Sequence, residues 1–291
     1  METYLDCLPC FLNQALRAAR AATKDETLQR QVVDAVAQMI PELPLDLKPP
    51  ELARQTYRII AEITGNKDPF HKAKAEANST VLAIYPRLQK IVQDSKDRLF
   101  TACRLAIAGN SIDLGPKFDY GSVGSLINIA ASPLPLTINE YDRFRKSLNT
   151  CQRILYLGDN AGEIVFDRLF IEEINHVRKL DICFVVRHIP VINDVTIDDA
   201  LTVGLDRIVR VVSSGSDAPA TVLPECSSEL QQLYHSADII ISKGQGNYES
   251  LEGEAGNIYF LLRAKCSLIA KSLGVNMGDC VLKQQRNSSV S

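Results

Sequence analysis

Apolar and polar positions over residues 4–93 recur with the spacing of amphipathic helices. The expected helices cover residues 11–23 and 25–40, a segment from Pro49 to about Gly65, another from about Asp68, and residues 97–108. Pro86 should interrupt the fourth of these helices, because proline lacks a backbone N–H and clashes with the preceding turn. The first part of the chain is therefore expected to be helical.

After Thr150 the pattern changes to short β-branched runs that alternate with longer amphipathic ones. The expected strands cover residues 153–157, 181–186, 207–212 and 238–242, with a helix over residues 164–177. Periodicity does not decide between helix and strand for residues 230–234 and 258–273. The alternation predicts a three-layer α/β/α fold with a mainly parallel sheet. We place a boundary near Thr150, between a helical N-terminal region (1–150) and an α/β domain (151–291).

Composition narrows the classes of function. Hydrophobic residues make up 46% of the chain and charged residues 23%, as in globular proteins. The formal net charge of -3 offers no basic face for a phosphate backbone, so no nucleic acid partner is expected. No apolar run approaches the roughly 20 residues needed to cross a bilayer, and the first residues lack the basic segment of a signal peptide. We therefore expect no membrane partner and a cytoplasmic location.

Residues 154–163 read Ile-Leu-Tyr-Leu-Gly-Asp-Asn-Ala-Gly-Glu, which is typical of a buried strand followed by a turn and a helix. Asp159 and Asn160 come where this strand should end, which is where parallel sheets carry their chemistry. Their oxygens suit a hard cation, and the pair carries only one negative charge, so an anionic substrate is still tolerated. An Asx turn that caps the following helix explains the same pair equally well.

Polar residues also follow the second and fourth expected strands. Asp194 lies in the loop after the second, and Lys243 and Gly244 follow the fourth. Because the carboxyl ends of parallel strands meet at one edge, these residues should converge with Asp159 and Asn160. Such a set is typical of a magnesium-assisted phosphate site, in which carboxylates hold the metal and a lysine and glycine-rich backbone meet the phosphate. Taken singly, Asp194 is as readily a helix N-cap and Lys243 a solvated charge.

The eight cysteines are spread along the chain, unlike those of a small disulfide scaffold, so most are expected to be buried thiols. Cys7 and Cys10 form a CxxC, whose spacing suits two thiolates on one metal ion. No second CxxC follows, and further ligands would have to come from distant residues such as Cys280 or His71. A second metal site, a redox pair and a pair of buried thiols therefore all stay open.

Several segments, in this order along the chain, carry a resemblance to a known family: the CxxC, residues 109–113 (Gly-Asn-Ser-Ile-Asp), residues 158–163 (Gly-Asp-Asn-Ala-Gly-Glu), residues 190–194 (Pro-Val-Ile-Asn-Asp) and residues 243–249 (Lys-Gly-Gln-Gly-Asn-Tyr-Glu). They resemble the damage-control phosphatases of domain of unknown function 89 (ARMT-like), in the prokaryotic branch with an N-terminal CxxC. The resemblance spans nearly the whole chain. It implies a helical N-terminal region packed on an α/β/α sheet and a divalent-metal-dependent phosphatase of small phosphorylated metabolites.

The resemblance also implies roles for individual residues. Asp159, Asn160 and Asp194 would hold the metal, and Lys243 would contact phosphate. Asn110 and Asp113 would line the substrate pocket.

The resulting hypothesis is hydrolysis of phosphate monoesters of small metabolites, such as sugar phosphates or their damaged forms, with Mg²⁺, Mn²⁺, Co²⁺ or Ni²⁺ as cofactor. Asp159 and Lys243 are the expected catalytic residues, and Lys243 and Gly244 are expected to meet the substrate phosphate. Haloacid-dehalogenase-like phosphatases carry a second aspartate two residues after the nucleophile, where this chain has Ala161. We therefore favour attack by water.

Two other classes of function are alternatives. An S-adenosylmethionine-dependent carboxyl methyltransferase activity has been attached to a eukaryotic branch of the same family, but this chain has no Gly-x-Gly-x-x-Gly motif. A protein that binds a metal or a metabolite without turnover, centred on Cys7 and Cys10 or on the same crevice, is the other alternative.

Overall fold

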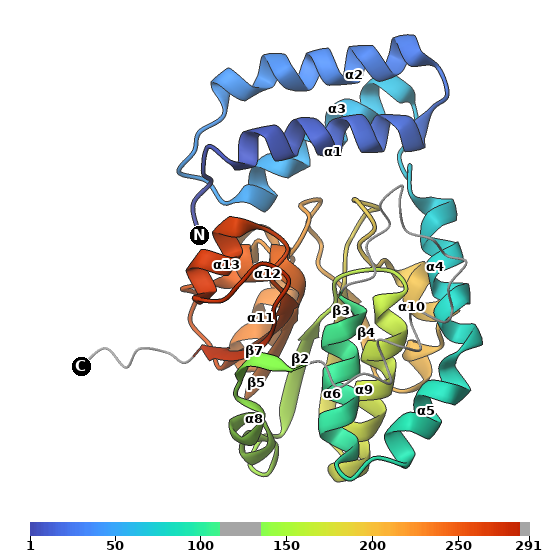
Figure 1. Ribbon diagram of the computed structural model, residues 1–291, viewed down its shortest axis with the longest axis vertical. Coiled ribbons are helices and arrows are strands. Elements are labelled where there is room, and N and C mark those ends of the chain that lie inside the picture. Colours follow the sequence, from blue (N-terminus) through green and yellow to red (C-terminus); the bar gives the residue numbers. More distant parts are fainter. Residues whose placement is uncertain (111–134, 286–291) are drawn as a thin grey trace.

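The computed structural model describes residues 1–110 and 135–285 of the 291-residue chain (Figure 1). The predicted substrate residue Asp113 lies outside the described residues. Asn110, the other residue of that prediction, is the last described residue before the gap.

The described residues form one seven-stranded sheet with the order β1-β7-β6-β5-β2-β3-β4. The strands are β1 (Leu136–Asn139), β2 (Arg153–Leu157), β3 (Asp181–Val186), β4 (Arg210–Ser213), β5 (Ile239–Lys243), β6 (Ile258–Arg263) and β7 (Cys280–Gln285). Every neighbouring pair is parallel except β6 and β7, which are antiparallel. The prediction of a mainly parallel sheet is therefore confirmed.

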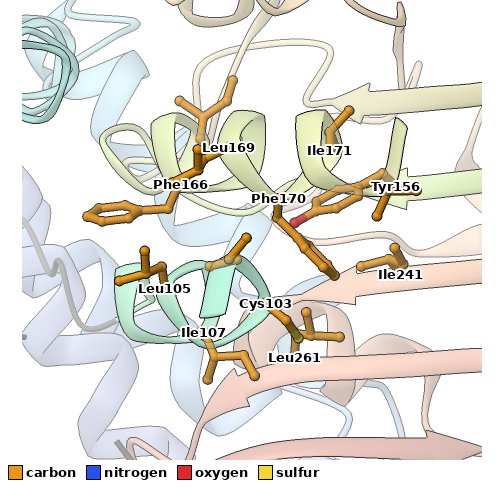
Figure 2. Close-up of a cluster of buried hydrophobic side chains, with 14 of the residues drawn as sticks. Cys103, Leu105, Ile107, Tyr156, Phe166, Leu169, Phe170, Ile171, Ile241 and Leu261 are labelled. Atoms are coloured by element: carbon orange, nitrogen blue, oxygen red, sulfur yellow. The ribbon is translucent and has the colours of Figure 1, made fainter. Parts of the chain in front are cut away.

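Alternation along each strand divides the core into two hydrophobic clusters, one on each face of the sheet. Ile154 and Tyr156 of β2 belong to one cluster, and Leu155 and Leu157 belong to the other. Figure 2 shows part of the first cluster, where side chains of α6 (Arg98–Gly109) and α9 (Glu163–Val177) meet Tyr156, Ile241 and Leu261 of the sheet. Both faces of the central strands are covered, which explains their nearly uninterrupted apolar sequences.

Helices cover both faces, as the sequence predicts. The first cluster also takes residues from α5 (Tyr85–Gln93), α8 (Tyr141–Leu148) and α10 (Ile197–Thr202), and α4 (His71–Ala83) packs beside them. The second cluster takes residues from α11 (Ser228–Ser236), α12 (Gly244–Leu251) and α13 (Ser267–Leu273). Short 3₁₀ turns lie at Ile40–Glu42, Leu205–Arg207 and Leu223–Glu225. Among the described helices, none has the length and apolar character needed to cross a membrane.

The remaining helices α1 (Cys7–Ala22), α2 (Glu26–Met39) and α3 (Pro49–Thr64) form a separate layer, which we call the cap (Figure 1). The cap has small hydrophobic clusters of its own, built around residues such as Ala15 and Leu52. Polar contacts attach it to the loop after β4 and to α12 with the turn that follows it. The cap therefore lies over the edge where the sequence predicts the site.

The structure refines several sequence-based element boundaries. The strand expected at 207–212 is β4, which begins later because Leu205–Arg207 forms a 3₁₀ turn. The undecided stretch 258–273 is a strand, β6, followed by the helix α13. The domain boundary placed near Thr150 stays a prediction. β1 lies on its N-terminal side and nevertheless pairs with β7 in the sheet.

Candidate active site

The loop after β2 and the loop after β3 lie side by side at the carboxyl edge of the sheet. Asn160 and Asp194 form an antiparallel bridge, in which the backbone N–H of Ala161 donates to the Asn193 carbonyl at 2.9 Å. The N–H of Val195 donates to the Asp159 carbonyl, also at 2.9 Å. Asn160 and Asp194, which are 34 positions apart in the chain, are thus held together by backbone hydrogen bonds. The structure therefore brings Asp159, Asn160 and Asp194 together, as the strand-end argument predicts.

Asp159 is held by side-chain amides. Its Oδ2 accepts from Nδ2 of Asn160 at 2.6 Å and from Nδ2 of Asn110 at 2.9 Å. The same two amides also donate to Glu163, at 3.0 Å each for its Oε2. Asn110 is the C-cap residue of α6, and its amide reaches the loop after β2. The alternative of a helix-capping Asx turn at Asp159 therefore does not describe this site.

Gly244 permits the close approach of Asp159 to the first turn of α12. A Cβ at Gly244 would lie 1.9 Å from Asp159 Oδ2, and the residue has a positive φ of 81°. Any other residue would meet both a steric clash and the unfavourable left-handed backbone. Gly244 is therefore required by the geometry of the carboxylate that faces it.

Asp194 is held by a buried arginine that the sequence analysis did not single out. The Nε of Arg187 donates to Asp194 Oδ2 at 2.6 Å, and both side chains are buried. The guanidinium also reaches the Gly158 carbonyl and Asn247 Oδ1, at 3.3 and 3.2 Å. The N-cap alternative for Asp194 does not hold, because Thr196 caps α10.

Lys243 is fully buried, which excludes the alternative of a solvated charge. Its Nζ donates to the Ala106 carbonyl at 2.9 Å, to Glu163 Oε1 at 2.7 Å and to Asp167 Oδ1. Tyr156 also donates its hydroxyl to Asp167 Oδ1, at 2.7 Å. Since an ammonium group has three N–H donors, all of them are used inside the protein. Contact between Lys243 and phosphate stays a prediction, and it requires one of these bonds to be exchanged.

The buried charges at this edge do not balance. Four carboxylates, of Asp159, Glu163, Asp167 and Asp194, accompany two cationic side chains, of Arg187 and Lys243. Burial raises the pKa of Asp159 well above its usual range, and the carboxylates of Glu163 and Asp194 raise it further. Burial also raises the pKa of Asp167, to about 6, although Lys243 acts in the opposite direction. The pKa of Lys243 is raised in spite of its burial, because Asp167 and Glu163 stabilise the ammonium form. An added cation would relieve this excess of negative charge.

The donor set fits a hard divalent cation. Within the described residues, Asp159 Oδ1, Asn160 Oδ1 and Asp194 Oδ1 accept no hydrogen bond, while the other polar atoms of these side chains are held. No group of three or more histidine, cysteine, aspartate or glutamate side chains that could hold a metal ion occurs in residues 1–110 and 135–285. The predicted ligand set contains only two such residues, Asp159 and Asp194, because its third ligand is the amide of Asn160. Such oxygen ligands suit Mg²⁺ or Mn²⁺, which retain several waters.

The other predicted residues are spread more widely. Cys7 and Cys10 lie on the first turn of α1, away from the loop after β2, and line a cavity between the cap and α12. Cys280 is buried in β7, and His71 lines a different cavity, so neither accompanies the CxxC. Glu163, Asp167 and Arg187 carry much of the site's charge but were assigned no role from sequence. The only signal for Glu163 and Asp167 is that they are acidic residues in the first part of the helix after the Asp-Asn pair, and the only signal for Arg187 is its position directly after the strand 181–186.

Comparison with known proteins covers nearly the whole chain. The sequence profile of the damage-control phosphatase ARMT1-like domain matches residues 3–281. A protein of Archaeoglobus fulgidus named damage-control phosphatase is 34% identical over 95% of this chain and 97% of its own. Another of that name, from Pyrococcus horikoshii, is 30% identical over 98% of this chain and 99% of its own.

The fold is similar to a solved structure. The crystal structure of a domain of unknown function 89 protein from Pyrococcus horikoshii superposes with a TM-score of 0.90 and 28% sequence identity. The superposition covers 98% of this chain and 100% of that one.

Proposed function

The chain belongs to the family of damage-control phosphatases with an ARMT1-like domain, and from this premise we propose that it is a divalent-metal-dependent phosphatase. Its substrates would be phosphate monoesters of small metabolites, such as sugar phosphates or their damaged forms. The relatives named damage-control phosphatases support the reaction class. The single observation that carries the metal dependence is a set of three oxygens that accept no hydrogen bond from any described residue, beside an excess of buried carboxylates.

Asp159, Asn160 and Asp194 would hold the metal. When bound, a divalent ion supplies a Lewis acid that polarises phosphoryl oxygens. The chain's own residues prepare this site. The amides of Asn110 and Asn160 fix one oxygen of Asp159, and Arg187 fixes one oxygen of Asp194, so the remaining oxygens are pre-oriented.

The first turn of α12 would receive the phosphate. Gly244 begins the helix directly after β5, and backbone N–H groups at a helix N-terminus favour an anion. Gly244 is buried against Asp159, so a phosphate here would lie next to the proposed metal ligands. Asp113 and Asn110 stay predicted pocket residues. Asn110 donates a hydrogen bond to Asp159, so contact of Asn110 with a substrate would also affect the position of the Asp159 carboxylate.

Lys243 would act mainly through Glu163 and Asp167, which it neutralises in part. Water would be the nucleophile, because the position two residues after Asp159 is the buried Ala161 and offers no acid. The buried carboxylates would repel the substrate phosphate unless a bound cation offsets their negative charge. This electrostatic requirement links phosphate binding to metal binding.

The test is phosphate release by Asp159→Asn and Asp194→Asn proteins with a panel of sugar phosphates and Mg²⁺, Mn²⁺, Co²⁺ or Ni²⁺. Each substitution keeps the side-chain volume and removes one negative charge from the proposed ligand set. We expect kcat/KM to fall by at least ~10²-fold. Replacing a residue that binds the metal should reduce activity more than replacing a residue that only hydrogen-bonds to a metal ligand.

Asp34→Asn is the matched control, since Asp34 pairs with Arg30 on the surface of α2 and with no other described residue. It should keep the parent activity. Full activity of either site variant in the presence of metal would refute the assignment, and the absence of phosphate release by the parent protein with every substrate and metal would refute the function.

A further inference from the structure

A second cluster of chemically active side chains lies between the cap and the sheet domain. It lines a cavity of about 410 Å³, which we call the thiol cavity. Cys7 and Cys10 come from the first turn of α1, Glu249 from α12, and Cys266 from the position just before α13. Three thiols and a carboxylate from distant parts of the chain therefore face one space.

The chemistry of the lining favours a cation. Asp6 and Glu249 contribute carboxylates, and no lysine, arginine or histidine side chain is found among the described residues that line the cavity. An anionic ligand such as a phosphate ester would find no countercharge there, so the cavity is not suited to the proposed substrate. Sulfur ligands also favour borderline or soft cations over Mg²⁺.

Amide side chains hold two of the sulfurs toward the cavity. Gln245 Nε2 donates to Cys266 Sγ at 3.5 Å and to Glu249 Oε1 at 2.8 Å. Gln14 Nε2 donates to Cys10 Sγ at 3.4 Å. Cys7, Cys10 and Cys266 are also the cysteines that the structure leaves partly or fully exposed, whereas the other five are buried. The thiol cavity thus collects the accessible cysteines of the chain.

We propose that Cys7, Cys10, Cys266 and Glu249 form a binding site for a thiophilic divalent cation such as Zn²⁺. This site is distinct from the oxygen-rich site at Asp159. The described residues show no preassembled cluster of metal-holding side chains, so binding must draw these four together by rotation of their side chains. The thiols would lose their protons to solvent as the cation binds.

Such a cation would link the cap to the edge of the sheet that carries the candidate active site. Gln245 and Gly246 also line the thiol cavity, and they follow directly on Gly244, which touches Asp159. The first turn of α12 would then contact the thiol cavity on one side and the phosphatase site on the other. The four residues are positioning residues in this account, and none is assigned a part in phosphate hydrolysis.

The experiment uses the full chain, reduced and stripped of metal, and titrates it with Co²⁺ and with Zn²⁺. Thiolate-to-cobalt charge-transfer absorption reports sulfur ligation, which an all-oxygen site does not give. We expect this absorption in the parent protein, displacement of Co²⁺ by Zn²⁺, and at least ~10-fold weaker binding in Cys10→Ser and Cys266→Ser. Asp159→Asn should leave the absorption unchanged, which separates this proposal from the proposed function.

Cys151→Ser is the matched control, because Cys151 Sγ donates to the Leu148 carbonyl and serine can keep that bond. It should bind like the parent. Absence of the absorption from the reduced parent, or parent-like binding by Cys10→Ser, would overturn the proposal. So would a Cys7–Cys10 disulfide whose reduction yields no metal binding. Cys10 is exposed, so its variant decides the question even if Cys266→Ser fails to fold.

Discussion

At the scale of single residues, the contact of Gly244 with Asp159 is the tightest constraint on the candidate site. The carboxylate lies where the Cβ of any other residue would be, and the amides of Asn110 and Asn160 hold it there. A shift of Asp159 would also strain its backbone bond to Val195, next to Asp194. The positions of the proposed ligands are therefore coupled.

Gly244→Ala should nearly abolish phosphatase activity, because the new methyl group displaces Asp159. The left-handed backbone should also cost about 1–2 kcal/mol in unfolding free energy. Gly274→Ala is the matched control, since Gly274 also has a positive φ of 70° but has nothing within 4 Å of an added Cβ. Urea unfolding should show the backbone cost in both variants and a further loss from the clash with Asp159 in Gly244→Ala, and kinetic assays should show loss of activity only for Gly244→Ala. Equal activity of the two variants would contradict this prediction.

Sequence reasoning located Asp159, Asn160, Asp194 and Lys243 at one edge because strand ends in a parallel sheet must meet there. It did not find the role of Arg187 or Asp167. Asp167 acts on Lys243, 76 residues away, and Arg187 reaches Asn247, 60 residues away. No local pattern reveals these distant partners. Local spacing thus indicated where side chains meet, but not which charged side chains pair with one another.

At the scale of elements, β2, β5 and α9 are joined by a buried polar network. Tyr156 of β2 and Lys243 of β5 both donate to Asp167 of α9. This network lies within the apolar contact between the helix and the sheet, where Tyr156 stacks on Phe184. The helix is thereby fixed in position beside the loop that carries Asp159.

Tyr156→Phe should lower the unfolding free energy by about 1.5–3 kcal/mol above pH 7, because a hydrogen bond to a charged group is lost. The effect depends on pH with a defined sign. The pKa of Asp167 is raised to about 6 in the folded protein, so its contribution to stability decreases as pH rises from about 4 to about 6. The tyrosine hydroxyl opposes that rise in pKa because its hydrogen bond stabilises the ionised form of Asp167. The variant should therefore lose more stability at pH 8, where Asp167 is ionised, than at pH 4.5. Urea unfolding at both pH values tests this, and an equal loss at both would contradict it.

Some strands were predictable from their own sequence, whereas others form only because a neighbouring strand pairs with them. Runs covered on both faces, such as β2 and β3, were found with their bounds because uninterrupted apolar sequence is distinctive. The strands β1 and β7 were missed, since Leu136–Asn139 is short and half-exposed and Cys280–Gln285 ends in polar residues. Both depend on pairing with neighbouring strands, β1 with β7 and β7 with β1 and β6, rather than on their own pattern.

At the scale of the whole molecule, ion pairs attach the cap to the sheet domain. Arg54 of α3 binds Glu225 through both Nη atoms, at 2.6 and 2.8 Å, and also reaches Asp217. Lys48 binds Glu254 at 2.7 Å and the Ser250 carbonyl. Since the cap has hydrophobic clusters of its own, these contacts govern docking more than its internal folding.

Arg54→Ala should loosen the cap without unfolding the sheet. Removing a partly buried arginine that holds two carboxylates should cost about 1–2 kcal/mol of docking free energy. Hydrogen exchange followed by mass spectrometry should show faster exchange in peptides of α1 and α3 and unchanged exchange in β2 and β5. Arg30→Ala, which removes only an exposed pair on α2, should leave both regions unchanged. Faster exchange throughout the molecule, or none, would contradict a docking role.

The position of β7 in the sheet has a consequence for synthesis on the ribosome. β7 lies between β1 and β6, although it is the last of the described strands in the chain. While the polypeptide is still emerging, β1 has no neighbour among the described strands, and the edge of β6 that will pair with β7 stays open. Completion of the sheet must therefore follow translation of Cys280–Gln285, and in a nascent chain stalled before that point β1 and the free edge of β6 are exposed to chaperones.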